Sequence, residues 1–311
     1  MTKLGSQLIV NLAIFIAILA VSEHAEGKIA VFVSIAPQKY FVQQIGKEMV
    51  DIQVMIQPGA DAHTYEPKPK QMVAITKAKL YFAIGIEFEK ARLKKLSQVN
   101  PNMRVVQTDQ GIQKIAMAAH RHRDGERYPK IGEHHPGAEY GQGQDHYSQA
   151  GLDPHIWLSP PLVMNQARTI LTALQKIDPA HRAIYEANYS AFVSEIAELH
   201  ADIKNTFAGK RGLQFMVFHP SWGYFAQAYG LHQIPVEIEG KHPKPAQLRE
   251  LIGHAQENEI RVIFVQPQFS VRSAEVIARG IGGQVVFADP LAENWADNLR
   301  KVAQQIKVEL R

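Results

Sequence analysis

The sequence predicts an α/β protein with two βα lobes, each built on a four-stranded parallel sheet, joined by one long linker helix. Short β-branched runs alternate with amphipathic stretches in the first part of the chain, and the same alternation returns after residue 212. Between these regions, residues 179–207 keep a helical spacing of apolar side chains without any Gly. Alternating strands and helices are typical of parallel sheets with helical crossovers, and an unbroken helical pattern predicts a stiff connector.

Residues 1–25 have the layout of a secretory signal peptide. Lys3 precedes an apolar run from Leu8 to Val21, and small residues follow, with cleavage expected after Ser22 or Ala25. The run is shorter than the roughly 20 apolar residues that a spanning helix needs. The chain has no Cys, so neither a disulfide nor a lipidated cysteine is expected. We therefore expect an exported, freely diffusing periplasmic protein that acts as a monomer.

The first lobe is predicted over residues 26–178. Helices are expected between its strands, for example at Pro37 to Gly46 and Pro69 to Ala78. The four predicted strands are Lys28 to Ile35, Asp51 to Gln57, Leu80 to Ile84 and Met103 to Gln107.

One segment of this lobe, residues 118–149, is rich in Gly, His and charge and has almost no apolar periodicity. That composition predicts a long mobile loop. The loop either chelates metal weakly or is a solvated tether, and its five histidines are His120, His122, His134, His135 and His146.

The linker helix, residues 179–207, is predicted to begin after Asp178 as its cap, with Pro179 in the first turn. At about 1.5 Å per residue it would be roughly 40 Å long, enough to run beside both lobes. A continuous helix disfavours the large hinge motion that a Gly-rich linker would allow.

The second lobe is predicted over residues 208–311. Its strands are expected at Leu213 to Phe218, Gln233 to Ile238, Val262 to Val265 and Gln284 to Phe287. Its helices are expected at Trp222 to Tyr229, Pro245 to Asn258, Ser273 to Arg279 and Trp295 to Leu310.

Four residues of metal-ligand type follow predicted strands in turns that contain Pro or Gly. In the first lobe they are His63, in "PGADAHTYEP", and His155, in "LDPHIWLSP". In the second lobe they are His219, in "FMVFHPSWGYF", and Asp289, in "VVFADPLAENW". Because parallel sheets place functional groups at the carboxyl ends of their strands, a cleft between the lobes would bring these residues together.

Three neutral imidazoles and one carboxylate form a four-coordinate nitrogen and oxygen set that suits Zn²⁺. The sequence therefore predicts a zinc site in the interlobe cleft, although these residues match no compact zinc motif and a single His beside Pro is more often a structural residue. Trp157 and Trp222 are interpreted as packing residues, and Glu237, Glu239 and His242 as a solvated turn.

Five motifs, "PGADAHTYEPKP", "LDPHIWLSPP", "FHPSWGYFAQAYGL", "VQPQFS" and "DPLAENW", resemble in order those of the periplasmic zinc-uptake binding proteins of ABC transporters, the ZnuA or TroA-like solute-binding family. The resemblance implies two lobes, one long helix and a metal between the lobes. It places His63, His155, His219 and Asp289 on the family's ligand positions. Manganese and iron binders that resemble this family usually have Glu at the third position, so His219 favours zinc, and residues 118–149 look like the variable His-rich loop of zinc members.

The chain departs from that resemblance at two points. Many relatives have Glu-Pro at Gln266-Pro267, which bears on local packing more than on zinc, and some have a disulfide that this chain cannot form. The resemblance implies capture of Zn²⁺ and its delivery to an inner-membrane ABC permease with a cytoplasmic ATPase.

Other functions are distinguished by sequence features. A manganese- or iron-binding member of the same family is the first alternative. A zinc hydrolase would use three His ligands, a water and Glu66 as base, but the chain has no HExxH, GxSxG or P-loop signature. A metal-stabilised adhesin is a further alternative, but the sequence contains no repeat and no obvious adhesive surface. The net charge of +4 without a long basic block does not support nucleic-acid binding.

Overall fold

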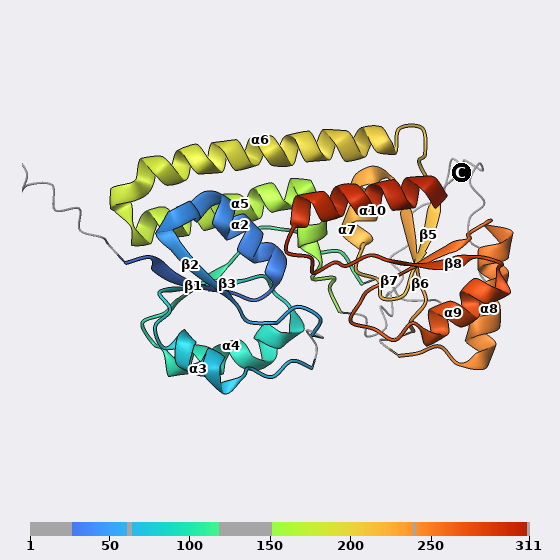
Figure 1. Ribbon diagram of the computed structural model, residues 1–311, viewed down its shortest axis with the longest axis horizontal. Helices are drawn as coiled ribbons and strands as arrows, with labels where there is room; N and C mark the ends of the chain where they lie inside the picture. The colour runs from blue at the N-terminus through green and yellow to red at the C-terminus, as the bar shows by residue number, and fades with distance from the viewer. Residues whose placement is uncertain (1–26, 61–63, 118–150, 239–240, 310–311) are drawn as a thin grey trace, which may run out of the picture.

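The computed structural model describes residues 27–60, 64–117, 151–238 and 241–309. The predicted signal peptide, His63, Glu239 and the His-rich segment 118–149 lie outside these residues. Two lobes lie side by side, and a long helix runs along both of them (Figure 1). No helix in the described ranges has both the length and the apolar character needed to cross a membrane.

The first lobe contains a parallel sheet with strand order β2-β1-β3-β4. Its strands are β1 (Ile29–Val33), β2 (Val50–Val54), β3 (Leu80–Ala83) and β4 (Arg104–Gln107). The helices α2 (Ala36–Gly46), α3 (Pro69–Ile75), α4 (Glu87–Val99) and α5 (Pro160–Ile177) flank it, with α3 and α4 on the side opposite α2 and α5 (Figure 1). β3 is buried along its whole length, as expected for a strand covered by helices on both faces.

The second lobe repeats this topology with strand order β6-β5-β7-β8. Its strands are β5 (Gln214–Val217), β6 (His232–Pro235), β7 (Val262–Val265) and β8 (Gln284–Phe287). Its helices are α7 (Gly223–Tyr229), α8 (Pro245–Glu257), α9 (Arg272–Gly280) and α10 (Trp295–Glu309). The predicted fold class of two four-stranded parallel sheets is therefore confirmed.

The long helix is confirmed as α6 (Arg182–Thr206), with a separate 3₁₀ turn, Pro179–His181, before it. Its buried residues fall at helical spacing, and the helix packs on α5, α2 and α10. Asp178 does not cap α6 in the predicted way. Instead its Oδ2 accepts hydrogen bonds from the Tyr185 hydroxyl at 2.6 Å and from His181 Nδ1 at 2.7 Å, which secure the turn between α5 and α6.

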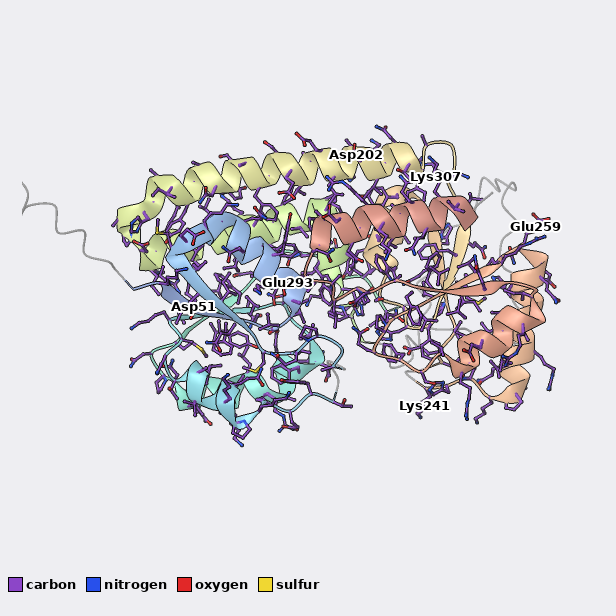
Figure 2. The ribbon with its side chains drawn as sticks, in the orientation of Figure 1. Asp51, Asp202, Lys241, Glu259, Glu293 and Lys307 are labelled. Carbon is purple, nitrogen blue, oxygen red and sulfur yellow. The ribbon has the colours of Figure 1, made fainter. Side chains whose placement is uncertain are left out.

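One hydrophobic core runs through both lobes. It includes the inner residues of the first sheet, one face of the second sheet, and α5, α6 and α10. A smaller core lies between the other face of the second sheet and helices α8 and α9. Trp295 at the start of α10 stacks edge-on against Phe41 of α2, and Glu293, labelled in Figure 2, pairs with Lys39 at 2.7 Å. The lobes are thus packed against each other as well as linked.

Candidate metal centre

His155 follows a short antiparallel bridge between residues 115–117 and residues 151–153. Asp153 N donates to Ile115 O at 2.9 Å and Met117 N donates to Gly151 O at 3.0 Å, so these two parts of the chain lie side by side. Asp153 is fully buried, and its Oδ1 accepts hydrogen bonds from the His155 backbone N–H at 2.9 Å and from His155 Nδ1 at 2.7 Å. Pro154 and Asp153 therefore fix both the backbone and the ring of His155.

His219 follows β5, the strand at which the order of the second sheet reverses. Its Nδ1 lies 2.7 Å from Oε1 of Glu237, and its ring stacks on Phe269 with centroids 5.2 Å apart. Glu237 is only 7% exposed. The interpretation of Glu237 as part of a solvated turn is therefore wrong: the carboxylate is buried because it holds the imidazole.

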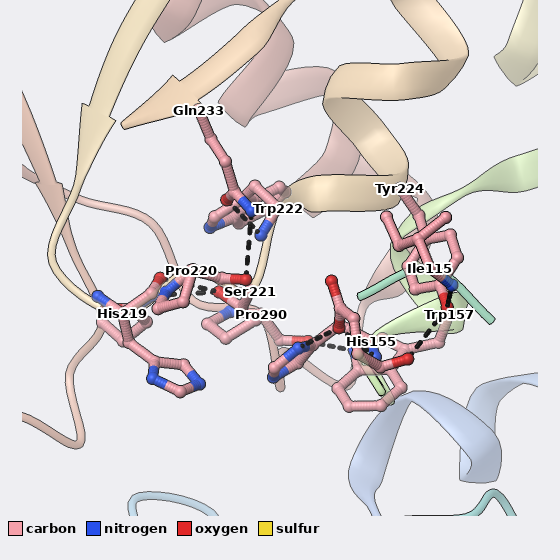
Figure 3. A network of polar contacts seen from close by, with 12 residues as sticks. Ile115, His155, Trp157, His219, Pro220, Ser221, Trp222, Tyr224, Gln233 and Pro290 are labelled. Atoms are coloured by element: carbon pink, nitrogen blue, oxygen red, sulfur yellow. Dashed lines mark hydrogen bonds and ion pairs between the residues drawn. The ribbon is translucent and has the colours of Figure 1, made fainter. Parts of the chain in front are cut away.

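The turn that contains His219 is held by two glutamines, Gln266 and Gln233, of which Gln233 is labelled in Figure 3. Gln266, after β7, accepts from His219 N at 3.2 Å and donates to His219 O at 2.7 Å and to Ser221 Oγ at 2.9 Å. Gln233 of β6 accepts from Trp222 N at 3.0 Å and donates to Pro220 O at 3.2 Å. An amide can donate and accept at once, so each glutamine fixes two points of the turn.

The two histidines come from different lobes and face each other, with ring centroids 5.3 Å apart (Figure 3). A carboxylate only accepts hydrogen bonds, so Nδ1 carries the hydrogen in both rings. In a neutral imidazole the lone pair then lies on Nε2, the form in which His binds metals. Both side chains line a cavity of about 230 Å³ between the lobes, whose walls include Ile35, Gly85, Trp157, Phe269 and Leu291.

Asp289 follows β8, at the same edge of the second sheet as His219. Its Oδ1 accepts from Gln268 Nε2 at 3.1 Å and from Leu291 N at 2.9 Å, and Gln268 and Leu291 both line the cavity. His63 is outside the described residues. Among the residues that are described, no three His, Asp or Glu side chains are grouped closely enough to hold a metal ion.

A buried carboxylate that the sequence did not indicate supports the first-lobe wall of the cavity. Glu89 in the first turn of α4 accepts hydrogen bonds from Gly85 N at 2.6 Å, Ile84 N at 2.9 Å and Ser34 Oγ at 2.5 Å. Burial raises the pKa of Glu89, and these hydrogen bonds oppose the rise.

Gly85, in the same wall of the cavity, has a positive φ of 82°. A Cβ there would collide with the ion pair between Asp109 and Lys114, so only glycine fits.

The lobes are joined beside the cavity by hydrogen bonds of aromatic side chains. Trp157 Nε1 donates to Pro290 O and Trp295 Nε1 donates to Trp157 O, both at 2.7 Å. Burial raises the pKa of Tyr224 to about 12, so its hydroxyl keeps its proton and donates to Asp153 O at 2.8 Å. Trp157 packs, as predicted, and also links the lobes at the turn that contains His155.

Three supporting residues, Asp153, Glu237 and Gln266, were not singled out from the sequence as partners of the histidines. Asp153 had a local signal, since an Asp two residues before a His can accept from that residue's backbone in an Asx turn. Glu237 and Gln266 had none, because they are 18 and 47 residues from His219 and approach it only when parallel strands pair.

A fold of two parallel βα lobes, with a long helix beside them and a cavity between them, defines the class of ABC-transporter solute-binding proteins. Within that class, residues 31–308 match the family model described as "ZnuA: Zinc-uptake complex component A periplasmic", and the chain belongs to this family. The family is a periplasmic metal-binding transport component and not a class of enzymes.

Relatives support this assignment in sequence and in structure. The high-affinity zinc uptake system protein ZnuA of Bacillus subtilis (strain 168) is 26% identical over 85% of this chain and 79% of its own length. A structure described as "Crystal structure of ZnuA" is 38% identical, covers 92% of this chain and 100% of its own, and has a TM-score of 0.80. A deletion mutant of ZnuA with zinc bound is 39% identical over 91% of this chain and 98% of its own, with a TM-score of 0.78.

More distant structures share the fold alone. A manganese-bound mutant of a periplasmic metal-binding protein from Candidatus Liberibacter asiaticus is 19% identical, over 92% of this chain and 100% of its own, with a TM-score of 0.73. The fold thus occurs with zinc in one relative and with manganese in another.

Proposed function

We propose that this protein captures Zn²⁺ in the periplasm, after removal of residues 1–25, and delivers it to an ABC permease driven by a cytoplasmic ATPase. The proposed ligands are His63, His155, His219 and Asp289. The observation that carries the proposal is the pair of imidazoles from opposite lobes, His155 and His219, each held at Nδ1 by a buried carboxylate. Carboxylate-supported histidine is the usual arrangement around protein-bound zinc.

Zinc is preferred over manganese because of the donor atoms. Imidazole nitrogen suits Zn²⁺, whereas Mn²⁺ favours carboxylate and carbonyl oxygen. The carboxylates of Asp153 and Glu237 contact the rings at Nδ1 and so act through the histidines. The zinc bound in the related ZnuA deletion mutant agrees with this preference.

The proposal is tested by titrating metal-stripped protein with Zn²⁺ and Mn²⁺ and measuring heat of binding and melting temperature. We expect one tight Zn²⁺ site, weaker Mn²⁺ binding and a melting temperature that rises with zinc. Each of His63→Ala, His155→Ala and His219→Ala should lose tight binding, while the control His232→Ala, on an exposed side chain of β6, should retain it. Absence of zinc binding at neutral pH would refute the proposal.

The His-rich segment 118–149 is proposed to add weak metal sites apart from the cleft. Deleting residues 125–147 should leave the tight site intact and lower the total zinc bound. An unchanged stoichiometry after deletion would show that the segment is a tether.

A further inference from the structure

The outer face of the first lobe carries five exposed lysines on and beside α3 and α4. We name it the α3–α4 lysine face and define it as Lys68, Lys70, Lys77, Lys94 and Lys95. Helices α3 and α4 lie together on one side of the first sheet, away from α6 (Figure 1). Exposed positions on α4 recur at helical spacing, so its lysines project on one side of the helix.

The net positive charge of the segment that carries this face is larger than that of the whole chain. Residues 66–104 contain nine Lys and Arg and three Glu, a net charge of +6, whereas the whole chain has +4. Glu89 is buried, Glu87 pairs with Lys90 at 3.0 Å, and Glu66 pairs with Arg92. Within the described parts of the chain, no carboxylate forms an ion pair with the five lysines of the face.

The sign of this charge excludes a role in collecting metal. Glu87 and Lys90 line the interlobe cavity, so α4, which carries Lys94 and Lys95 of the face, begins at the side of the cleft. Like charges repel, and a positive surface beside the cleft lowers the local concentration of a divalent cation. A partner that complements the face must therefore be anionic.

The composition of the face favours lipid headgroups over a protein partner. Protein interfaces are depleted in Lys and enriched in Arg and aromatic residues. The exposed residues of α3 and α4 include no aromatic side chain, and the exposed large hydrophobic ones are Val73, at 65%, and Val99, at 40%. Clusters of four to eight basic residues on a helical surface are characteristic of binding to anionic lipid.

We propose that the α3–α4 lysine face binds the surface of a membrane that contains anionic phospholipids. Only the identity of that membrane, the outer surface of the inner membrane, rests on the proposed function. Contact through this face would hold the first lobe and the side of the cleft near the membrane in which the permease lies. Confinement to a surface raises the effective concentration of the protein at the permease without any new protein contact.

The test is sedimentation of the chain from residue 26 onward with vesicles of phosphatidylcholine alone or mixed with phosphatidylglycerol. We expect binding only to the mixed vesicles, and loss of binding when the ionic strength rises from about 0.05 M to about 0.5 M. A triple variant, Lys70→Glu, Lys77→Glu and Lys94→Glu, should reduce partitioning by at least about 100-fold, because each lysine near an anionic surface contributes about fivefold and each new carboxylate is repelled.

The matched control is Lys241→Glu, Lys301→Glu and Lys307→Glu, which changes the net charge equally on exposed lysines of the second lobe, two of them labelled in Figure 2. It should bind the mixed vesicles within a few-fold of the parent chain. Equal loss in both triple variants, or no binding by the parent chain, would overturn the proposal. The proposal would also be overturned if the chain bound only phosphatidylcholine vesicles that contain the permease and the lysine variant lost that binding. The partner of the face would then be an acidic protein. Zinc titration of the lysine variant should be unchanged, which separates this proposal from the zinc site.

Discussion

At the scale of single residues, the candidate metal centre depends on side chains that position the two histidines. Asp153 and Glu237 contact Nδ1 of His155 and His219 at the same distance of 2.7 Å, one from each lobe. Each carboxylate orients a ring and makes its Nε2 a stronger donor to a metal. A histidine held at Nδ1 by a buried carboxylate is thus present in both lobes, which supports a single site shared between them.

The first residue-scale prediction concerns the charge of Glu237. Glu237→Gln keeps an oxygen that can accept from His219 Nδ1 but removes the negative charge. We expect Zn²⁺ affinity to fall about 10-fold to 100-fold, as is typical when a partner of a metal-bound histidine is altered. The measurement is a competitive zinc titration, with Glu275→Gln on an exposed side chain of α9 as the control. Unchanged affinity would show that the negative charge of Glu237 does not contribute to zinc binding.

A second prediction concerns Gln266, which fixes the backbone of His219. Gln266→Met has a similar volume and removes all three hydrogen bonds of the side-chain amide. The buried His219 N–H and C=O would lose partners, so we expect a loss of about 1–3 kcal/mol in the free energy of unfolding.

Zinc affinity should fall together with stability in this variant, because the turn that contains His219 is released. Urea unfolding and zinc titration measure the two effects, and Gln256→Met at an exposed position of α8 is the control. A destabilised variant with normal zinc affinity would mean that the turn is held without Gln266.

At the scale of helices and strands, local patterns predict all eight described strands and the long helix. Each predicted strand overlaps an observed one, because alternating apolar runs bounded by Pro and Gly specify strands locally. Helix α5 was not among the elements predicted, although Pro160 and Pro161 in its first turn and its apolar spacing are local signals. The supporting contacts of the candidate metal centre were not predictable in this way, since Glu237 and Gln266 reach His219 from neighbouring strands.

The turn between α5 and α6 leads to a pH-dependent prediction. Burial alone would raise the pKa of Asp178, but hydrogen bonds from Tyr185 and His181 outweigh it and hold the pKa below its usual value. A carboxyl whose pKa is lowered by folding stabilises the fold above its unfolded pKa, near 3.9, and loses that contribution as the pH falls through the folded pKa.

Asp178→Asn should therefore destabilise the protein by about 1 kcal/mol at pH 7, a value reduced by solvent screening of a partly exposed group. The difference from the parent chain should shrink as the pH falls below about 4. Urea unfolding across this range measures it, with Asp202→Asn on an exposed side chain of α6 as the control. A difference that does not change with pH would mean that the charge of Asp178 does not contribute.

At the scale of the whole molecule, the two lobes form one packed unit. The main core contains residues of both sheets and of α5, α6 and α10, and the indole of Trp295 packs on Phe41 with centroids 5.1 Å apart. The turn that contains His155 is bonded to the second lobe through Trp157, Trp295 and Tyr224. The separation of the two histidines is therefore tied to the packing of one lobe on the other.

This arrangement predicts that the lobes unfold together. Calorimetry of the metal-stripped chain should give one transition whose calorimetric and van't Hoff enthalpies agree, because neither lobe keeps its core without the other.

Trp295→Ala should lower the free energy of unfolding by about 3–5 kcal/mol, because the substitution leaves a cavity. Trp295→Phe should lower it by less, because Phe keeps most of the packing and loses only the hydrogen bond to Trp157 O. Both variants should also bind zinc more weakly, because the support of the turn around His155 is lost. Two separate transitions in the parent chain would contradict the continuous core. Normal zinc affinity in Trp295→Ala would show that the positions of His155 and His219 do not depend on the packing of one lobe on the other.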